Sequence, residues 1–191
     1  MEMVDETFGQ LDILVNNAGG QFVAPVREVS NKGFEAVIRN NLIGSWQMTK
    51  AVADRFMFER GGAIVFVTAS IRAGLAGFVH TAAARGGRHG LDEDLGLRMG
   101  PVGIRLNCVA PGTIKTEALG RYPIPLEDWH RFNRNVLIKI GHPQDVPGRY
   151  LPRLGLGEFV PGEDWYVDGG ETLHVAHDAR EMINYVQVQG P

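Results

Sequence analysis

The sequence has a single cysteine and no excess of basic residues, and each shortage excludes a class of protein. Cys108 has no second thiol to pair with, so the chain has no internal disulfide scaffold and fits a reducing compartment. Lys and Arg number 19 against 22 Asp and Glu, a net charge of −3, which provides no basic footprint for nucleic acid. We therefore expect no nucleic-acid partner.

Long apolar runs are also missing. No stretch approaches the ~20 apolar residues that a membrane-spanning helix needs. Near the start, Glu2 and Asp5 stand where a secretory signal would carry basic residues. We expect a cytoplasmic protein with no membrane partner, and its 191 residues, 44% of them hydrophobic, suffice for one domain with its own core.

Short apolar runs that end in turn-forming residues recur along the sequence, and each predicts a buried strand. They cover residues 11–15, 63–67, 104–110 and 165–167 and end in NNAGG, TAS, PG and DGG. Helical periodicity separates them, first from the candidate N-cap Ser30 to Gly61 and then over residues 81–99. This alternation predicts an α/β fold, a Rossmann-type parallel sheet with helices on both faces.

Glycine is abundant, with 25 residues, and some of it falls where a helix is expected. Within the predicted helix 81–99, each interior glycine costs ~1 kcal/mol relative to alanine; these are Gly86, Gly87, Gly90 and Gly96. We expect a helix of low intrinsic stability that packing holds in place.

The order of the strand ends resembles the short-chain dehydrogenase/reductase family, whose members bind NAD(P)(H) on a Rossmann-type sheet. LDILVNNAG at 11–19 is similar to the family's turn against the cofactor, and PGTIKT at 111–116 to its segment beside the nicotinamide. The resemblance implies cofactor contacts from Asn16, Asn17, Ala18, Gly19, Pro111, Gly112 and Thr113. NNLIG at 40–44 is similar to the family's N-L-x-G, which implies that Asn41 kinks its helix and holds a water in a proton relay.

Two further segments, HTAAARGG at 80–87 and RLNCVAPGTIKTE at 105–117, are most similar to the branch of peroxisomal trans-2-enoyl-CoA reductases and their bacterial relatives. The neighbouring dienoyl-CoA reductases are similar too. The branch implies NADP(H) or NAD(H) as cofactor and a small-molecule substrate, an acyl-CoA thioester. The family implies a homodimer or homotetramer.

The family's opening strand and G-x-x-x-G-x-G turn, which seats the pyrophosphate on a helix N-terminus, have no counterpart before Leu11. We therefore expect residues 1–170 to form a Rossmann-type domain that is incomplete, truncated at its N-terminal edge, with residues 171–191 as a C-terminal extension. Enzyme activity would then depend on a supplied cofactor-binding part.

The catalytic positions depart from the family as well. Its tyrosine and lysine fall at Thr81 and Arg85, and a threonine hydroxyl is too weak an acid near neutral pH to replace a phenol. The enoyl-CoA reductase branch shares a small hydroxyl residue and an arginine here. The catalytic serine corresponds to Ser70 or to Thr68 two residues earlier, where either hydroxyl could polarise a carbonyl or cap the loop. The resemblance implies the catalytic set Asn41, Ser70, Thr81 and Arg85.

Other titratable residues have competing interpretations. One branch member has a tyrosine at the position of His89, so His89 is either a group that titrates near neutral pH or, with Glu93, part of a solvated helix face. Asp92 and its acidic neighbours predict a charged exposed face. We predict no metal site, because His80, His89, His130 and His142 lack metal-ligand spacing, and His174 and His177 lie in the C-terminal tail. Cys108 lies in an apolar run and is expected to be a buried, inert thiol.

Two functions follow. The first is an NAD(P)(H)-dependent oxidoreductase of the short-chain type that reduces enoyl-CoA thioesters. The alternative is a catalytically inactive relative that serves as a binding or oligomerisation module.

Overall fold

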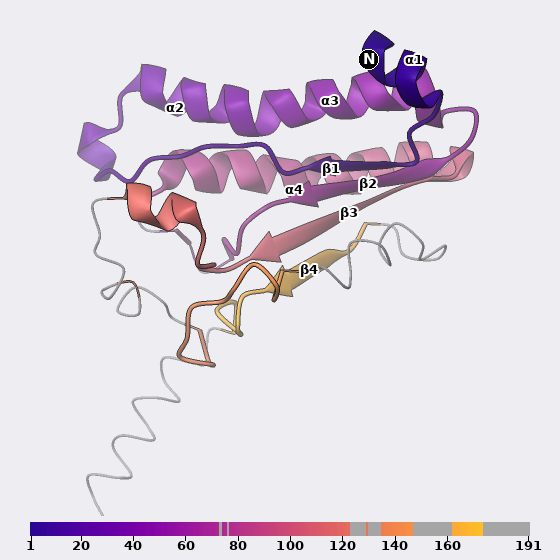
Figure 1. Ribbon diagram of the computed structural model, residues 1–191. Helices are drawn as coiled ribbons and strands as arrows, with labels where there is room; N and C mark the ends of the chain where they lie inside the picture. The colour runs from indigo at the N-terminus through magenta and orange to yellow at the C-terminus, as the bar shows by residue number, and fades with distance from the viewer. Residues whose placement is uncertain (73, 76, 123–128, 130–134, 147–161, 174–191) are drawn as a thin grey trace, which may run out of the picture.

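The centre of the fold is a sheet of four parallel strands in the order β1-β2-β3-β4 (Figure 1). The strands are β1 (Ile13–Asn16), β2 (Gly62–Val67), β3 (Ile104–Pro111) and β4 (Asp164–Val167). The computed structural model describes residues 1–72, 74–75, 77–122, 129, 135–146 and 162–173. The parallel sheet confirms the predicted α/β, Rossmann-type class.

Alternate side chains of the strands point to opposite faces of the sheet and meet different partners. Ile64, Phe66 and Leu106 belong to the main core, together with helix residues that include Val52, Phe56, Met57 and Met99. On the other face, Val65 and Val109 contact Val146 and Val167. The central strands β2 and β3 are therefore buried on both sides, as their continuous apolar sequences predict.

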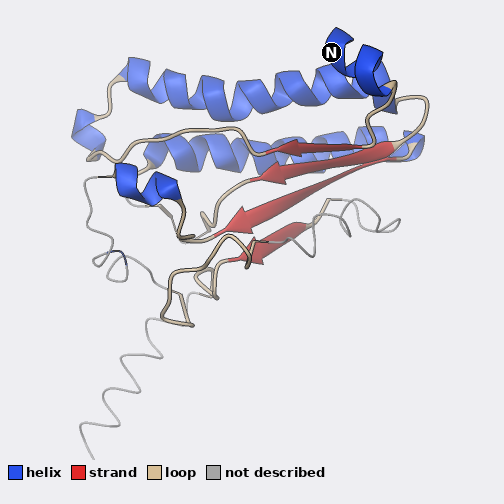
Figure 2. Ribbon diagram, in the orientation of Figure 1, coloured by secondary structure: helices blue, strands red, loops and turns tan. Residues whose placement is uncertain are grey.

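The described helices are α1 (Glu2–Phe8), α2 (Asn31–Ile38), α3 (Gly44–Val52) and α4 (Val79–Met99), with 3₁₀ turns η1 (Val26–Glu28), η4 (Gly100–Val102) and η5 (Glu117–Arg121). Helices α2 and α4 contact each other and lie on the same side of the sheet (Figure 2). In this sheet each strand lies next to the one that precedes it in the sequence, always on the same side. Right-handed connections between such strands place the connecting helices on the same face of the sheet. Among the described residues, no helix combines the length and apolar character needed to cross a bilayer.

The predicted helix from Ser30 to Gly61 is one long rod with two π-helical turns, η2 (Arg39–Ile43) and η3 (Ala53–Met57). The Ser30 side chain accepts a hydrogen bond from the Gly33 amide at 3.1 Å, which confirms it as the N-cap. The first π turn contains Asn41, the residue expected to kink the helix. The helical prediction is thus confirmed, with its irregularity at the residue that the family motif singles out.

Several sequence features fall outside the described part of the chain. The predicted extension 171–191 is described only as far as Leu173. The residues Pro123, Pro125, His130, His174 and His177 also lie outside it.

Two glycines of α4 differ in their surroundings, so substitutions at these positions distinguish the effect of helix propensity from that of packing. A Cβ at Gly90 would meet nothing within 4 Å, whereas one at Gly87 would lie 2.7 Å from Leu42 Cδ2. We expect Gly90→Ala to raise the free energy of unfolding by about 1 kcal/mol, because it removes the backbone entropy cost of glycine. Gly87→Ala should gain less or lose stability, because Leu42 must move. Urea unfolding of both variants checks this, and equal gains would contradict it.

Candidate active site

A cavity of about 520 Å³ lies where the carboxyl ends of β1, β2 and β3 meet their loops. Ligands bind at this edge in open parallel sheets. Most of the lining is apolar, and its polar side chains include Asn17, Ser70, Arg85, Thr113, Tyr122 and Glu171. An apolar pocket with a few convergent polar groups is the usual form of a small-molecule site.

The two asparagines at the end of β1 have different roles. Asn16 is buried, and its side-chain amide donates to Thr49 Oγ1 at 2.9 Å, which ties β1 to α3. Asn17 is exposed and lines the cavity. Gly19 has no room for a side chain, because a Cβ there would lie 2.3 Å from Asn41 Oδ1 and 2.8 Å from Arg85 Nη2. The turn therefore brings its main chain against two polar groups from other elements.

Asn41 is fully buried within η2 and holds the turn after β1. Its side-chain amide donates to the Gly20 carbonyl at 2.8 Å and to the Val37 carbonyl at 2.9 Å. Its Oδ1 atom has no hydrogen-bond partner among the described residues. Because a buried acceptor without a partner is costly, this atom marks a position that a ligand or water would satisfy.

Arg88 donates hydrogen bonds to main-chain carbonyls of three segments. Its guanidinium donates to the carbonyls of Asn41 at 2.7 Å, Val67 at 2.6 Å and Ala18 at 2.7 Å, and to that of Asn16 at 3.3 Å. The side chain is completely buried, and this burial together with the charge of Arg85 lowers its pKa. Arg88 thus fixes the turn after β1, the end of β2 and the π turn relative to one another.

Arg85, one helical turn before Arg88, reaches the cavity itself. Its guanidinium donates to the Val67 carbonyl, while its Nε has no partner among the described residues. Burial lowers the pKa of Arg85 to about 10, and the interaction with Tyr122 opposes that change. The side chain therefore presents a desolvated positive charge to the cavity.

Ser70 and Thr68 both line the cavity from the loop after β2. The Thr68 hydroxyl donates to the Val109 carbonyl at 3.1 Å, and the Ser70 hydroxyl donates to Asp168 Oδ2 at 2.8 Å. Asp168 also accepts bonds from the backbone amides of Gly170 and Thr172, both at 2.9 Å. With its one proton committed to Asp168, Ser70 faces the cavity as a hydrogen-bond acceptor.

The end of β3 and the segment after it line the cavity with Pro111, Gly112 and Thr113. The Gly112 amide donates to the Val167 carbonyl at 3.1 Å, and a Cβ at Gly112 would lie 2.9 Å from Asp168 Cα. The close approach of this turn to the end of β4 therefore requires glycine. Its three residues lie with Asn17, Ser70 and Arg85 in one cavity, although up to 96 positions separate them in the sequence.

Thr81, at the position of the family's tyrosine, lies away from these residues. It is completely buried, its Oγ1 is 3.0 Å from His80 Nδ1, and it is not among the residues that line the cavity. Of the four residues in the implied catalytic set, Ser70 and Arg85 line the cavity and Asn41 lies behind Gly19.

Sequence reasoning missed a phenol in this cavity. Tyr122 lines it from the end of η5, and its ring packs edge-on against Phe78 and Trp129, with centroids 5.7 and 5.6 Å away. It lies close enough to Arg85 for their charges to interact. The segment after β3 has no regular periodicity, so only the three-dimensional structure could reveal it. The structural roles of Arg88 and Asp168 were also missed, although the Asp-Gly-Gly that follows β4 marked a turn there.

The prediction of a solvated face at residues 89–94 is wrong for two residues. Asp92 is 1% exposed, and the side chain of His89 is 15% exposed, with its Nδ1 2.6 Å from Asp164 Oδ1. Glu93 and Asp94 are exposed. The physical reason is helical phase, since Asp92 follows the buried Arg88 by four residues and shares its face. Cys108 is buried, as predicted.

A parallel sheet with helical crossovers, a cavity at its strand ends and glycine at two close approaches defines a Rossmann-type ligand-binding domain. Residues 1–172 match the sequence model of the family described as Enoyl-(Acyl carrier protein) reductase. The chain therefore belongs to this family of short-chain dehydrogenases/reductases.

Individual relatives agree with this assignment. The peroxisomal 2,4-dienoyl-CoA reductase of Danio rerio is 31% identical over 190 residues, which cover 96% of this chain and 63% of that protein. The (2S)-[(R)-hydroxy(phenyl)methyl]succinyl-CoA dehydrogenase subunit BbsD of Thauera aromatica is 33% identical, over 88% of this chain and 68% of its own. The structure of a citronellol catabolism dehydrogenase from Pseudomonas aeruginosa superposes with a TM-score of 0.76 at 31% identity, over 90% of this chain and 66% of the other. The chain thus spans about two thirds of the length of these relatives.

We expect Arg88→Met to lower the free energy of unfolding by at least about 3 kcal/mol, because the carbonyls that Arg88 holds lose a buried, charged donor. Arg98→Met is the matched control, since Arg98 is an exposed residue of the same helix and pairs only with Asp94 among the described residues. It should change stability little. Denaturant unfolding measures both variants. An Arg88→Met protein as stable as the parent would show that the hydrogen bonds of Arg88 contribute nothing to stability.

Proposed function

We propose that the chain acts as an NAD(P)(H)-dependent oxidoreductase that reduces the carbon–carbon double bond of an enoyl-CoA thioester. The observation that carries this proposal is the desolvated cation Arg85 at the edge of a mostly apolar cavity, beside the turn that contains Gly19. An acyl chain suits the apolar lining, and a thioester oxygen that gains negative charge suits the guanidinium.

The residues at the strand ends fit the nicotinamide side of a dinucleotide. Asn41 Oδ1 and Arg85 Nε are buried atoms without partners among the described residues, and both side chains approach Gly19. A carboxamide N–H and a ribose hydroxyl would satisfy an acceptor and a donor of this kind. When bound, the reduced nicotinamide supplies a hydride. The choice between NADP(H) and NAD(H) is open in this proposal, and the binding experiment below addresses it.

Arg85 and Ser70 have distinct tasks in this proposal. Addition of a hydride at Cβ of the enoyl thioester places negative charge on the thioester oxygen, and a fixed cation in a desolvated site stabilises such charge strongly. Arg85 supplies that cation. Ser70 donates its proton to Asp168 and so fixes the loop after β2.

Tyr122 is the proposed proton donor to Cα. It is a phenol in the cavity, beside the guanidinium of Arg85. Thr81 has neither property, since its hydroxyl is buried against His80 and a threonine hydroxyl is a very weak acid. The acid would thus come from the segment after β3 rather than from α4.

The names of the relatives support a thioester substrate. The dienoyl-CoA reductase and the succinyl-CoA dehydrogenase both carry coenzyme A in the names of their substrates, and as enzymes they favour the oxidoreductase over the inactive module. We also retain the proposal of a homodimer or homotetramer. Large apolar side chains on the rod from α2 to α3 are half exposed, which suits an interface; they are Ile43, Trp46 and Met48.

Dinucleotide binding and turnover test the proposal directly. We expect the chain to bind NADPH or NADH and to oxidise it with crotonyl-CoA or hexadienoyl-CoA. Arg85→Met should lower kcat/KM by about 100-fold, whereas Ser70→Ala should cost less than about tenfold. Arg72→Met is the control, because Arg72 is exposed and contacts Tyr166 outside the cavity.

A second protein helps to interpret a negative result. If the chain binds neither dinucleotide alone, we expect binding after fusion to the Gly-rich strand-turn-helix of a relative. Failure of both proteins to bind would overturn the oxidoreductase and favour the binding or oligomerisation module.

Tyr122→Phe tests the proton donor. The variant keeps the ring contacts with Phe78 and Trp129, so KM should change little, while kcat should fall by about 100-fold through loss of the acid. Thr81→Val is the matched control and should retain kcat. The reverse pattern, with the Thr81 variant inactive and the Tyr122 variant active, would assign the acid to α4.

A further inference from the structure

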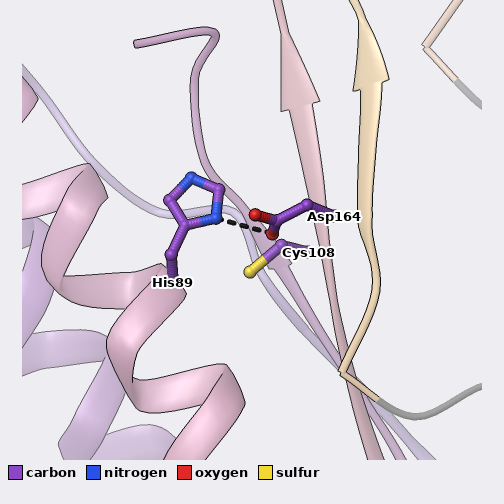
Figure 3. A group of neighbouring side chains, drawn as sticks. All are labelled: His89, Cys108 and Asp164. Atoms are coloured by element: carbon purple, nitrogen blue, oxygen red, sulfur yellow. Dashed lines mark hydrogen bonds and ion pairs between the residues drawn. The ribbon is translucent and has the colours of Figure 1, made fainter. Parts of the chain in front are cut away.

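A second cluster of reactive side chains lies apart from the cavity, between α4 and the last two strands (Figure 3). It contains His89 from α4, Cys108 from β3 and Asp164 from β4, with one ligand atom of each within 4.8 Å of the others. His89 Nδ1 lies 2.6 Å from Asp164 Oδ1. Cys108 and Asp164 occupy directly opposite positions in the β3–β4 ladder, which places both beneath the same helix.

A fourth side chain belongs to this group. Asp92 follows His89 by three residues on α4, the spacing that puts two helical side chains side by side. It is 1% exposed and interacts electrostatically with Asp164, His89 and Cys108. Its Oδ1 has no hydrogen-bond partner among the described residues, and neither has His89 Nε2. A buried carboxylate with an unused oxygen beside a thiol and an imidazole is incomplete as a hydrogen-bond network.

The charges around the cluster also indicate that it is incomplete. The cluster brings the carboxyl groups of Asp92 and Asp164 and the thiol of Cys108 together, and these groups interact electrostatically. The nearby cations that oppose this accumulation of negative groups are Arg88, which interacts with Cys108, and Arg72, which interacts with Asp164. Neither guanidinium forms a hydrogen bond to Asp92 among the bonds of the described residues.

We propose that His89, Asp92, Cys108 and Asp164 form a structural zinc site that is separate from the active site. One thiolate, one imidazole and two carboxylates are a mixed nitrogen, sulfur and oxygen set that suits Zn²⁺. Ligand atoms around tetrahedral zinc lie roughly 3.3 to 3.8 Å apart, given its bond lengths. His89, Cys108 and Asp164, whose ligand atoms lie within 4.8 Å of one another, therefore need only small side-chain movements to close around the ion, and Asp92, which interacts with Cys108, would supply the fourth ligand.

The placement of the ligands argues for a structural rather than a catalytic metal. All four positions come from the protein, which leaves none for water or substrate, and none of the four residues lines the cavity. Zn²⁺ would offset most of the negative charge of the thiolate and the two carboxylates. It would also join α4, β3 and β4 at a place where β4 pairs with β3 over only four residues.

Metal titration of the full chain tests the proposal, with Zn²⁺ and Co²⁺ as probes. We expect one equivalent of Zn²⁺ to bind and to raise the thermal unfolding temperature. Co²⁺ should give the charge-transfer absorption of a thiolate ligand together with the visible bands of a tetrahedral ion. Cys108→Ala should abolish the charge-transfer band, and Asp92→Asn and His89→Gln should each weaken zinc binding by more than about tenfold.

Two control variants separate this site from adventitious binding. Asp94→Asn removes an exposed carboxylate two residues from Asp92, and His142→Gln removes an exposed imidazole elsewhere. Both should bind zinc like the parent protein. The proposal is overturned if the parent binds no stoichiometric zinc, if its cobalt form lacks thiolate absorption, or if Asp92→Asn binds as tightly as Asp94→Asn. The zinc stoichiometry and the cobalt spectrum are measured on the parent protein. They therefore test the proposal even if a variant does not fold.

Discussion

The architecture of the active site depends on one buried guanidinium. Arg88 supplies hydrogen bonds to main-chain carbonyls of the turn after β1, the end of β2 and the π turn of the long helical rod. The carbonyls of Asn16, Ala18 and Val67 lie at or just after strand ends, where no ladder satisfies them completely, and that of Asn41 lies within the π turn. A fork of several donors in one plane is suited to this task, and lysine could not reproduce it. Gly19 and Asn17 owe their positions beside the cavity to this set of bonds.

Helix α4 carries that guanidinium even though its sequence favours helix poorly. Gly87 leaves space for Leu42, and the resulting contact between η2 and α4 brings Arg88 within reach of the Asn41 carbonyl. An alanine-rich helix would be more stable by itself but would hold the π turn farther away. The glycine at position 87 thus lowers the intrinsic stability of α4 but allows the π turn to pack closely against it. The packing of α4 against β3 supplies what the propensity lacks.

The sheet and its helices could be predicted because apolar periodicity and turn residues report them directly. The family motifs also singled out Asn17, Ser70 and Arg85, which line one cavity. The orientation of α4 was harder to read, because its buried positions continue from Ala84 to Arg88 and Asp92 at a spacing of four. That spacing is helical, but charged residues at buried positions look like a solvated face when only their type is considered. What distinguishes them is the partner each one meets, and those partners come from distant strands.

Tyr122 shows a different limit of sequence reasoning. A catalytic acid must reach the reacting atom, and nothing in that requirement fixes the element that carries it. Arg85 occupies the position of the family's lysine, while the neighbouring phenol comes from the segment after β3 and packs on Phe78 at the start of α4. An alignment of motifs finds Thr81 on α4, which does not line the cavity, and cannot find Tyr122, the acid proposed above, because Tyr122 follows no family motif. The cavity is therefore a better guide to the chemistry of this chain than the motif.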